Sequence, residues 1–111
     1  MNRNEILKME AGPEINRLVY IHVMKWGEQA WIESRDSYIF RPSEEIKWAW
    51  KVVDALSKRN IHFVIFTQNN IAMTFANKFD GDYISEAGGA DDSIECAICR
   101  AALLAVMEFD G

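Results

Sequence analysis

Apolar and polar positions follow a helical period over residues 91–108. Every third or fourth residue of this run is apolar, which is the spacing that lines one face of an α-helix. This face consists of Ile94, Ala97, Ile98, Ala101, Leu104 and Ala105. A second apolar flank consists of Cys99, Leu103 and Val106. Asp91, Asp92 and Ser93 come just before and offer N-cap oxygens. The pattern predicts a central helix that is covered on more than one side.

Three further helices are predicted earlier in the chain, over residues 2–9, 13–26 and 43–59. Asn2 and Glu5 have the spacing of a capping box, which opens the first helix. Pro13 suits the first turn of the second helix. Ser43, followed by two glutamates, suits the N-cap of the third.

The third of these helices carries two tryptophans that cannot both face the core. Its predicted buried stripe consists of Ile46, Ala49, Trp50, Val53 and Leu56. Trp48 falls on a neighbouring face beside Lys47 and Lys51. Trp48 is therefore a candidate exposed aromatic for a binding or subunit contact. The alternative is that Trp48 packs under the segment 28–42.

Three strands are predicted between the last two helices. Residues 61–67 are mainly apolar at both odd-numbered and even-numbered positions, which indicates a strand covered on both faces. Residues 68–70 are turn-like, and residues 71–76 return with alternating large and small side chains, so the pair reads as a hairpin. Residues 83–87 form a short third strand. We predict an α+β fold: a three-stranded antiparallel sheet with helices packed on it.

Length and composition limit the class of protein. A chain of 111 residues that is 50% hydrophobic suits a single domain over 1–111. The sequence has no apolar run of membrane-spanning length, and its N-terminus lacks a signal peptide's apolar stretch, so we expect a soluble cytoplasmic protein. The net charge of −5 argues against nucleic-acid binding, because phosphate contacts need lysine and arginine.

The residue types that carry chemistry do not form a recognisable constellation. Cys96 and Cys99 form a C-x-x-C within the predicted central helix, where small core side chains suit the pattern better than redox chemistry. A zinc site would need two more ligands, and His22 and His62 are the only histidines. His22 lies on or beside the apolar face of its helix. We expect no metal and no cofactor, and we rank a hydrolase based on either histidine last.

Residues 28–42 form the least regular segment and place aromatic rings among charges. A long loop in a small domain tends to be functional or mobile. Trp31 and Tyr38 are candidates for stacking on a ligand, and Arg35 and Arg41 for pairing with a phosphate. The alternative is that these aromatic side chains fold back and extend the core.

Several segments together resemble the small phage proteins grouped as the phage ABA sandwich domain. They are NRNEILKMEAGPEINRLVYIHVMKW, RPSEEIKWAWKVVDAL and AICRAALLAVME. The matching positions are Ala11, Gly12, Leu18, Val19, Val23, Met24, Trp26, Pro42, Ser43, Ile46, Trp50, Val53, Leu56 and residues 97–102. The resemblance implies a phage or prophage origin and an α/β/α sandwich, but it offers no catalytic signature. Pro13 and the aromatic segment 28–42 depart from the expected pattern.

These observations favour a non-enzymatic phage or prophage accessory protein that binds a host protein or self-associates. The alternative is a protein that sequesters a small nucleotide immune signal, with Trp31, Arg35, Tyr38 and Arg41 as contacts. The first hypothesis depends on the candidate Trp48 and the missing chemistry. The second rests on an analogy with other small phage proteins that sequester such signals.

Overall fold

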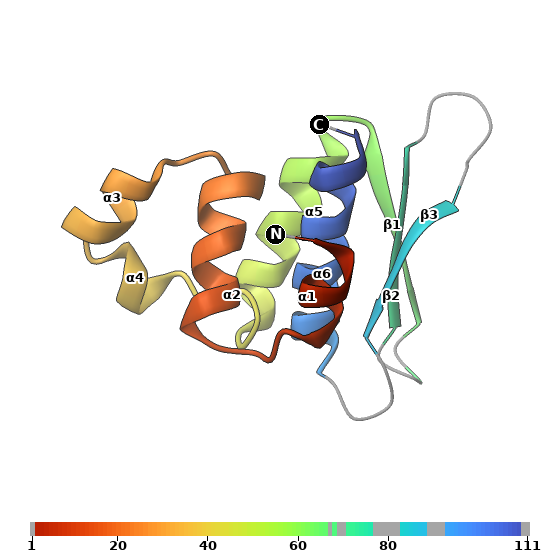
Figure 1. Cartoon of the computed structure of the whole chain (residues 1–111), viewed down its shortest axis with the longest axis horizontal. Coiled ribbons are helices and arrows are strands. Elements are labelled where there is room, and N and C mark those ends of the chain that lie inside the picture. Colours follow the sequence, from red (N-terminus) through yellow and green to blue (C-terminus); the bar gives the residue numbers. More distant parts are fainter. Residues whose placement is uncertain (1, 67, 69–70, 77–82, 89–92, 110–111) are drawn as a thin grey trace.

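A computed structural model describes residues 2–66, 68, 71–76, 83–88 and 93–109. The elements in chain order are α1 (Arg3–Lys8), α2 (Pro13–Leu18), the π-helix η1 (Val19–Val23), α3 (Glu28–Glu33), α4 (Asp36–Ile39), α5 (Ile46–Ser57), β1 (Ile61–Phe66), β2 (Ile71–Ala76), β3 (Tyr83–Gly88) and α6 (Ile94–Phe109). The sheet lies at one end of the long axis and the pair α3–α4 at the other (Figure 1). Among the described residues, no helix is long and apolar enough to cross a membrane.

Helix α6 is the central element, as its periodicity predicted. Every residue from Cys96 to Val106 is buried. One flank of α6 packs against β2 and β3, and others meet α1, α5 and η1. Because Ala and Cys side chains are small, they let these neighbours approach the helix closely. Cys96 and Cys99 are both buried, which confirms their interpretation as core residues.

The sheet has the order β1-β2-β3, and both pairings are antiparallel. The α+β class and the predicted hairpin of the first two strands are confirmed. Ala72 and Thr74 of β2 are fully buried on the face toward the helices, and Ile61 of β1 is 2% exposed. Residues of the other parity are open: Val64 is 41% exposed and Phe66 is 49% exposed.

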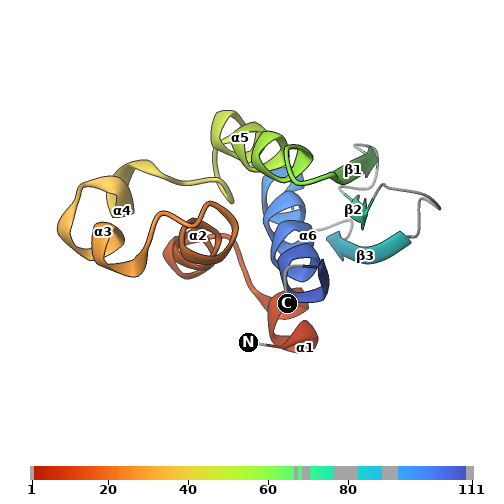
Figure 2. The ribbon, with the colours of Figure 1, turned by 90° about the horizontal axis from the view of Figure 1, so that it is seen from above.

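The prediction that residues 61–67 are covered on both faces is therefore wrong for the described strand. The helices lie on one face of the sheet (Figures 1 and 2), and among the described residues none lies on the other. The α/β/α layering that the resemblance implied is not seen in this part of the chain. An apolar pattern at both parities shows that both faces are apolar, but it cannot show what covers them.

The N-terminal helices follow their sequence signals at the start and depart at the end. Asn2 caps α1 through its side-chain oxygen, which accepts a hydrogen bond from the Glu5 backbone N–H at 2.9 Å. The predicted helix 13–26 begins at Pro13 but changes to the wider π form at residue 19. This change alters the direction of the side chains that follow, and His22 is exposed rather than part of an apolar face.

Helix α5 is rotated relative to its prediction. Its buried residues are Ala49, Val52 and Leu56, while Trp50 is 52% exposed and Ile46 is 41% exposed. Trp48 is half-buried, so the alternative in which it packs under residues 28–42 is the correct one. The helix begins at Ile46, and Ser43 is not its N-cap.

Candidate binding surface

Residues 28–42 are folded into two short helices. Gly27, at φ +91°, ends the preceding segment in a conformation that favours glycine, and α3 follows at once. A turn through Ser34 and Arg35 leads into α4. We call α3, α4 and this turn the lobe (residues 28–39). The lobe projects from the helical layer and contacts mainly α2 and η1 (Figures 1 and 2).

A cluster of five aromatic rings forms the base of the lobe. The Tyr20 ring centroid lies 5.1 Å from Trp26, 5.1 Å from Trp31 and 5.6 Å from Phe40. Phe40 also contacts Trp48 at 5.3 Å and Trp26 at 5.4 Å. Tilted and edge-to-face pairs of this kind contribute about 0.5–1.5 kcal/mol each beyond their area burial. The cluster therefore holds η1, the lobe and α5 together.

A polar contact fixes α4 on the same ring. The Tyr20 hydroxyl donates a hydrogen bond to Asp36 Oδ2, and the Asp36 backbone N–H donates to Ser34 Oγ at 3.0 Å. The hydrogen bond to Asp36 raises the pKa of Tyr20, and burial and the carboxylate charge act in the same direction. The phenol is thus held neutral, as a donor.

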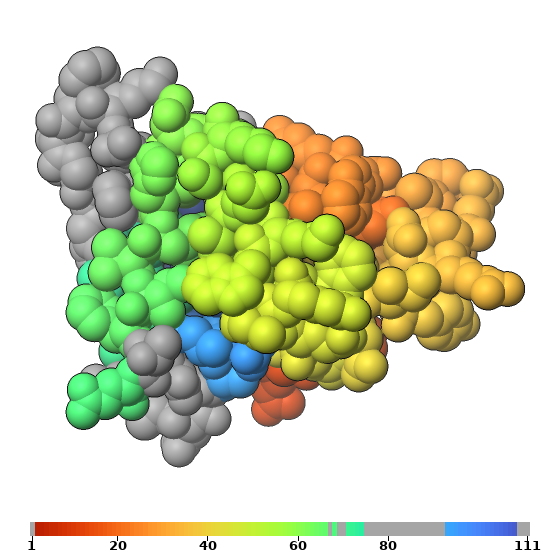
Figure 3. Space-filling model, turned by 180° about the vertical axis from the view of Figure 1, so that it is seen from behind, coloured from red at the N-terminus to blue at the C-terminus, as the bar shows by residue number. Residues whose placement is uncertain are grey.

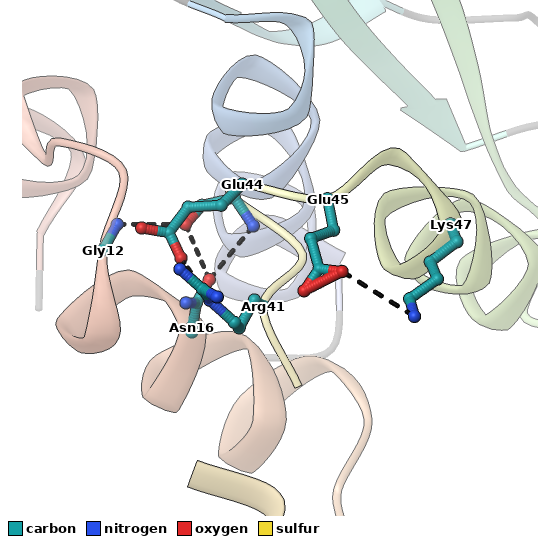
Figure 4. Close-up of polar contacts among 7 residues, drawn as sticks. Gly12, Asn16, Arg41, Glu44, Glu45 and Lys47 are labelled. Carbon is teal, nitrogen blue, oxygen red and sulfur yellow. Dashed lines mark hydrogen bonds and ion pairs between the residues drawn. The ribbon is translucent and has the colours of Figure 1, made fainter. Parts of the chain in front are cut away.

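Ser43 joins the segment after the lobe to the start of α2. Figure 4 shows its two partners, Gly12 and Asn16. Its Oγ accepts from the Gly12 N–H at 3.0 Å and donates to Asn16 Oδ1 at 2.6 Å. Its own N–H donates to the same Asn16 oxygen at 3.0 Å. Ser43 is 1% exposed and Asn16 is 2% exposed, so these bonds are largely hidden from water. They hold residues 41–45 against α2.

A shallow groove of about 560 Å³ runs along the lobe and α2. It is lined by Pro13, Glu14, Arg17, Trp31, Ser37 and Tyr38. Arg17 of α2 forms an ion pair with Glu28 of α3, which is not among the lining residues. Aromatic, cationic and hydroxyl groups therefore meet in one place, although the groove is open rather than enclosed.

The structure brings together only part of the predicted contact set. Trp31 and Tyr38 both line the groove, but Trp31 is 8% exposed and Tyr38 is 82% exposed. Arg35 and Arg41 are exposed and are not among the lining residues. Arg41 instead pairs with Glu44, with its Nε 2.8 Å from Glu44 Oε2, and this hydrogen bond raises the pKa of Arg41.

Trp48 lies outside the groove, on the α5 side of the aromatic cluster. Its ring packs on Phe40, and the Nζ atoms of Lys47 and Lys51 lie 5.9 Å and 5.4 Å from its centroid. Its indole N–H is buried and has no acceptor within the described part of the protein. Trp48 therefore packs within the aromatic cluster at the base of the lobe, and its ring is largely covered by Phe40 and the two lysines.

Three exposed apolar side chains on or beside the lobe were not predicted. Ile32 is 66% exposed, Ile39 is 49% exposed and Trp26 is 46% exposed. Ile32 and Ile39 each adjoin a buried aromatic residue, Trp31 and Phe40, and the sequence does not show which of the two neighbours faces outward. Together with Tyr38 they make the lobe rich in exposed apolar area. In residues 2–66, 71–74 and 93–108, no cluster of His, Cys, Asp and Glu could hold a metal ion.

The fold and this surface define a small α+β protein that has helices on one face of an antiparallel sheet and a projecting apolar lobe. The chain belongs to the Phage ABA sandwich domain family, whose model matches residues 17–103, from α2 to α6. The resemblance in the sequence is thereby confirmed. No curated protein matches the chain, and no solved structure matches it.

Proposed function

We propose that the protein is a non-enzymatic binding module of a phage or prophage, which docks on a host protein through the lobe. The observation that carries this proposal is the exposure of Ile32, Tyr38 and Ile39 on two short helices anchored by a ring cluster. Exposed aromatic and aliphatic side chains on a fixed base are the usual anchors of a protein interface.

The anchoring below the lobe favours binding over a purely structural role. The groove-facing Trp31 and the buried Phe40 hold the helices from inside, so the outward residues are not needed for the core. Exposing Ile32 and Tyr38 costs solvation free energy that a partner would recover. A preformed surface also reduces the entropy lost on binding.

Site-specific photo-crosslinking in a bacterial host tests the proposal. A photoreactive phenylalanine analogue would replace Ile32 or Tyr38, and Asn4 on α1 would serve as the exposed control position. We expect both lobe positions to label the same host protein, and the control position not to label it. In addition, Ile32→Asp should abolish labelling from position 38. Equal labelling from all three positions would refute the proposal.

The groove supports the alternative of a small nucleotide ligand. The open Tyr38 ring lies beside Arg17, which could pair with a phosphate if Glu28 released it. In this alternative, Tyr38→Ala and Arg17→Ala would abolish binding of a cyclic dinucleotide in calorimetry, and Arg41→Ala would leave it unchanged. Absence of heat with a panel of such nucleotides would exclude it.

A further inference from the structure

Strand β1 is an edge of the sheet. It pairs with β2 on one side, and no described strand pairs with its other side. A strand in this position carries a row of backbone N–H and C=O groups that can bind another strand. Proteins usually protect such edges with charged side chains, proline, a bulge or a covering element.

None of the first three devices is present on β1. Residues 60–77, which include β1 and β2, contain no Asp, Glu, Lys, Arg or Pro, although 26% of the whole chain is charged. The β1–β2 register is continuous, and the one irregularity described in the sheet lies between Thr74 and Phe75 on the β3 side. Val64 and Phe66 are also exposed on the open face. An uncharged, regular and apolar edge favours pairing.

Helix α5 adds exposed apolar area beside the β1 edge, on the face of the sheet that the helices cover. In an α-helix, residues two apart are separated by about 200° around the axis. Because Trp48 faces Phe40 in the aromatic cluster, Trp50 points away from that cluster, toward the side where α5 packs on β1. Trp50 and Ile46 are 52% and 41% exposed there. Figure 3 shows α5 (yellow-green) and β1 (green) side by side on one face of the molecule.

We propose that β1 pairs antiparallel with β1 of a second copy of this chain, so that the two sheets become continuous across a twofold axis. Residues opposite each other in such a pair must lie on the same face of the sheet, so their numbers have the same parity. An axis at Val64 places Val64 opposite its own copy and Phe66 opposite His62. An axis at Phe63 would leave Phe66 beyond the paired strand. The axis at Val64 is therefore preferred.

The absence of charge also favours a second copy over a foreign strand. Across a twofold axis, a charged residue on the axis lies opposite the same charge on its copy, which is unfavourable. Residues 60–77 present no formal charge that could repel in this way. A foreign partner imposes no such constraint, and an edge evolved for it would be free to carry a complementary charge. The α5 helices of the two copies would lie on the same face of the joined sheet and bring Trp50 to the interface.

Mass measurement and oxidative cross-linking test the pairing. At about 100 µM, a concentration that populates a dimer with a micromolar dissociation constant, we expect light scattering to show a dimer. Opposed Cα atoms in an antiparallel pair lie about 4.5–5.5 Å apart, within the range that a disulfide spans. Val64→Cys should therefore form a covalent dimer at least about tenfold faster than Ile32→Cys, because pairing raises the effective concentration of the thiols. His62→Cys and Phe66→Cys should cross-link to each other when mixed, faster than either does alone.

Two substitutions separate the pairing from folding. Val64→Lys places two like-charged side chains opposite each other across the axis, with Cβ atoms about 5 Å apart, and should give a folded monomer. Val64→Thr keeps the β-branched shape and should remain dimeric. Circular dichroism would check that both variants are folded. A monomeric wild-type protein, or equal cross-linking of Val64→Cys and Ile32→Cys, would overturn the proposal. Neither result would affect labelling from the lobe.

Discussion

Replacing Ser43 with alanine tests whether the buried contact between α2 and the 41–45 segment stabilises the fold. The substitution removes the hydroxyl that accepts from the Gly12 N–H at 3.0 Å and donates to Asn16 Oδ1 at 2.6 Å. The Ser43 backbone N–H keeps its bond to Asn16. Alanine fits the space, because it is smaller than serine and adds no atom.

The magnitude follows from these bonds. Each neutral hydrogen bond contributes about 1 kcal/mol, and Gly12, which is half-buried, loses its acceptor. We therefore expect Ser43→Ala to lower the free energy of unfolding by about 2 kcal/mol. Asn16→Ala leaves both Ser43 donors without their acceptor in a site that is 1% exposed, so we expect a loss of about 3 kcal/mol.

Urea unfolding followed by tryptophan fluorescence measures these losses and their coupling. Because both single variants break the same hydroxyl–amide bond, the double variant should lose about 1 kcal/mol less than the sum of the single losses. Ser57→Ala, at an exposed position of α5, is the matched control and should change stability by less than about 0.5 kcal/mol. A Ser43→Ala loss no larger than this control, or strictly additive losses, would refute the reasoning.

Three further predictions concern the aromatic cluster and the core. Trp48→Phe keeps the packing on Phe40 and removes a buried N–H that has no acceptor in the described region. Urea unfolding should show that Trp48→Phe lowers the free energy of unfolding by no more than about 1 kcal/mol, whereas Trp48→Ala lowers it by about 2 kcal/mol. Because the folded-state pKa of Tyr20 is raised, its contribution to stability is fully present below the unfolded pKa and is lost as the pH rises above about 10. Thermal unfolding scans should therefore show a smaller loss of stability at high pH for Tyr20→Phe than for the wild-type protein. Tyr38→Phe, at an exposed ring, should lose as much stability as the wild type. Burial raises the pKa of Cys99 well above its usual value, so mass spectrometry should find neither Cys96 nor Cys99 alkylated by iodoacetamide at pH 8 until urea unfolds the protein.

The central helix and the capping box could be predicted because their signals are local. In α6, small and apolar residues extend over several turns, and Arg100 is the only charged residue between Cys96 and Met107. Asn2 and Glu5 satisfy each other within a single turn. Local signals of this kind do not depend on how the rest of the chain folds.

The orientation of α5 could not be predicted because both of its flanks are apolar. A buried stripe that includes either Trp48 or Trp50 is plausible from the sequence. The Phe40 ring packs on Trp48 and so decides which tryptophan turns inward, but the sequence does not show this contact. Ser43 shows the same limit. Its position before acidic residues is typical of an N-cap, but a long-range bond to Asn16 uses its side chain instead. Tertiary contacts decide between local alternatives that are nearly equal in free energy.

The sequence predicted contact residues in the segment that forms the lobe, but it could not show which of the side chains in that segment face outward. The prediction depended on the aromatic residues that stand among charges in residues 28–42. Folding of this segment into α3 and α4 then turned Trp31 inward and left Ile32 and Ile39 outside. Which side chain faces out depends on where each short helix begins, and turns of so few residues have no stripe to fix this.

The two proposed surfaces lie at opposite ends of the 41 Å long axis, so pairing through β1 leaves both lobes open (Figure 1). A dimer with two free lobes would bind a surface carrying several partner molecules more tightly than one partner in solution, by a factor of up to about 10²–10⁴. Val64→Lys should therefore weaken binding to a densely immobilised partner but not to the soluble monomeric partner. Ile32→Asp should weaken both, because it alters the lobe itself. Equal affinity of Val64→Lys and Val64→Thr for the dense surface would show that the two surfaces act independently.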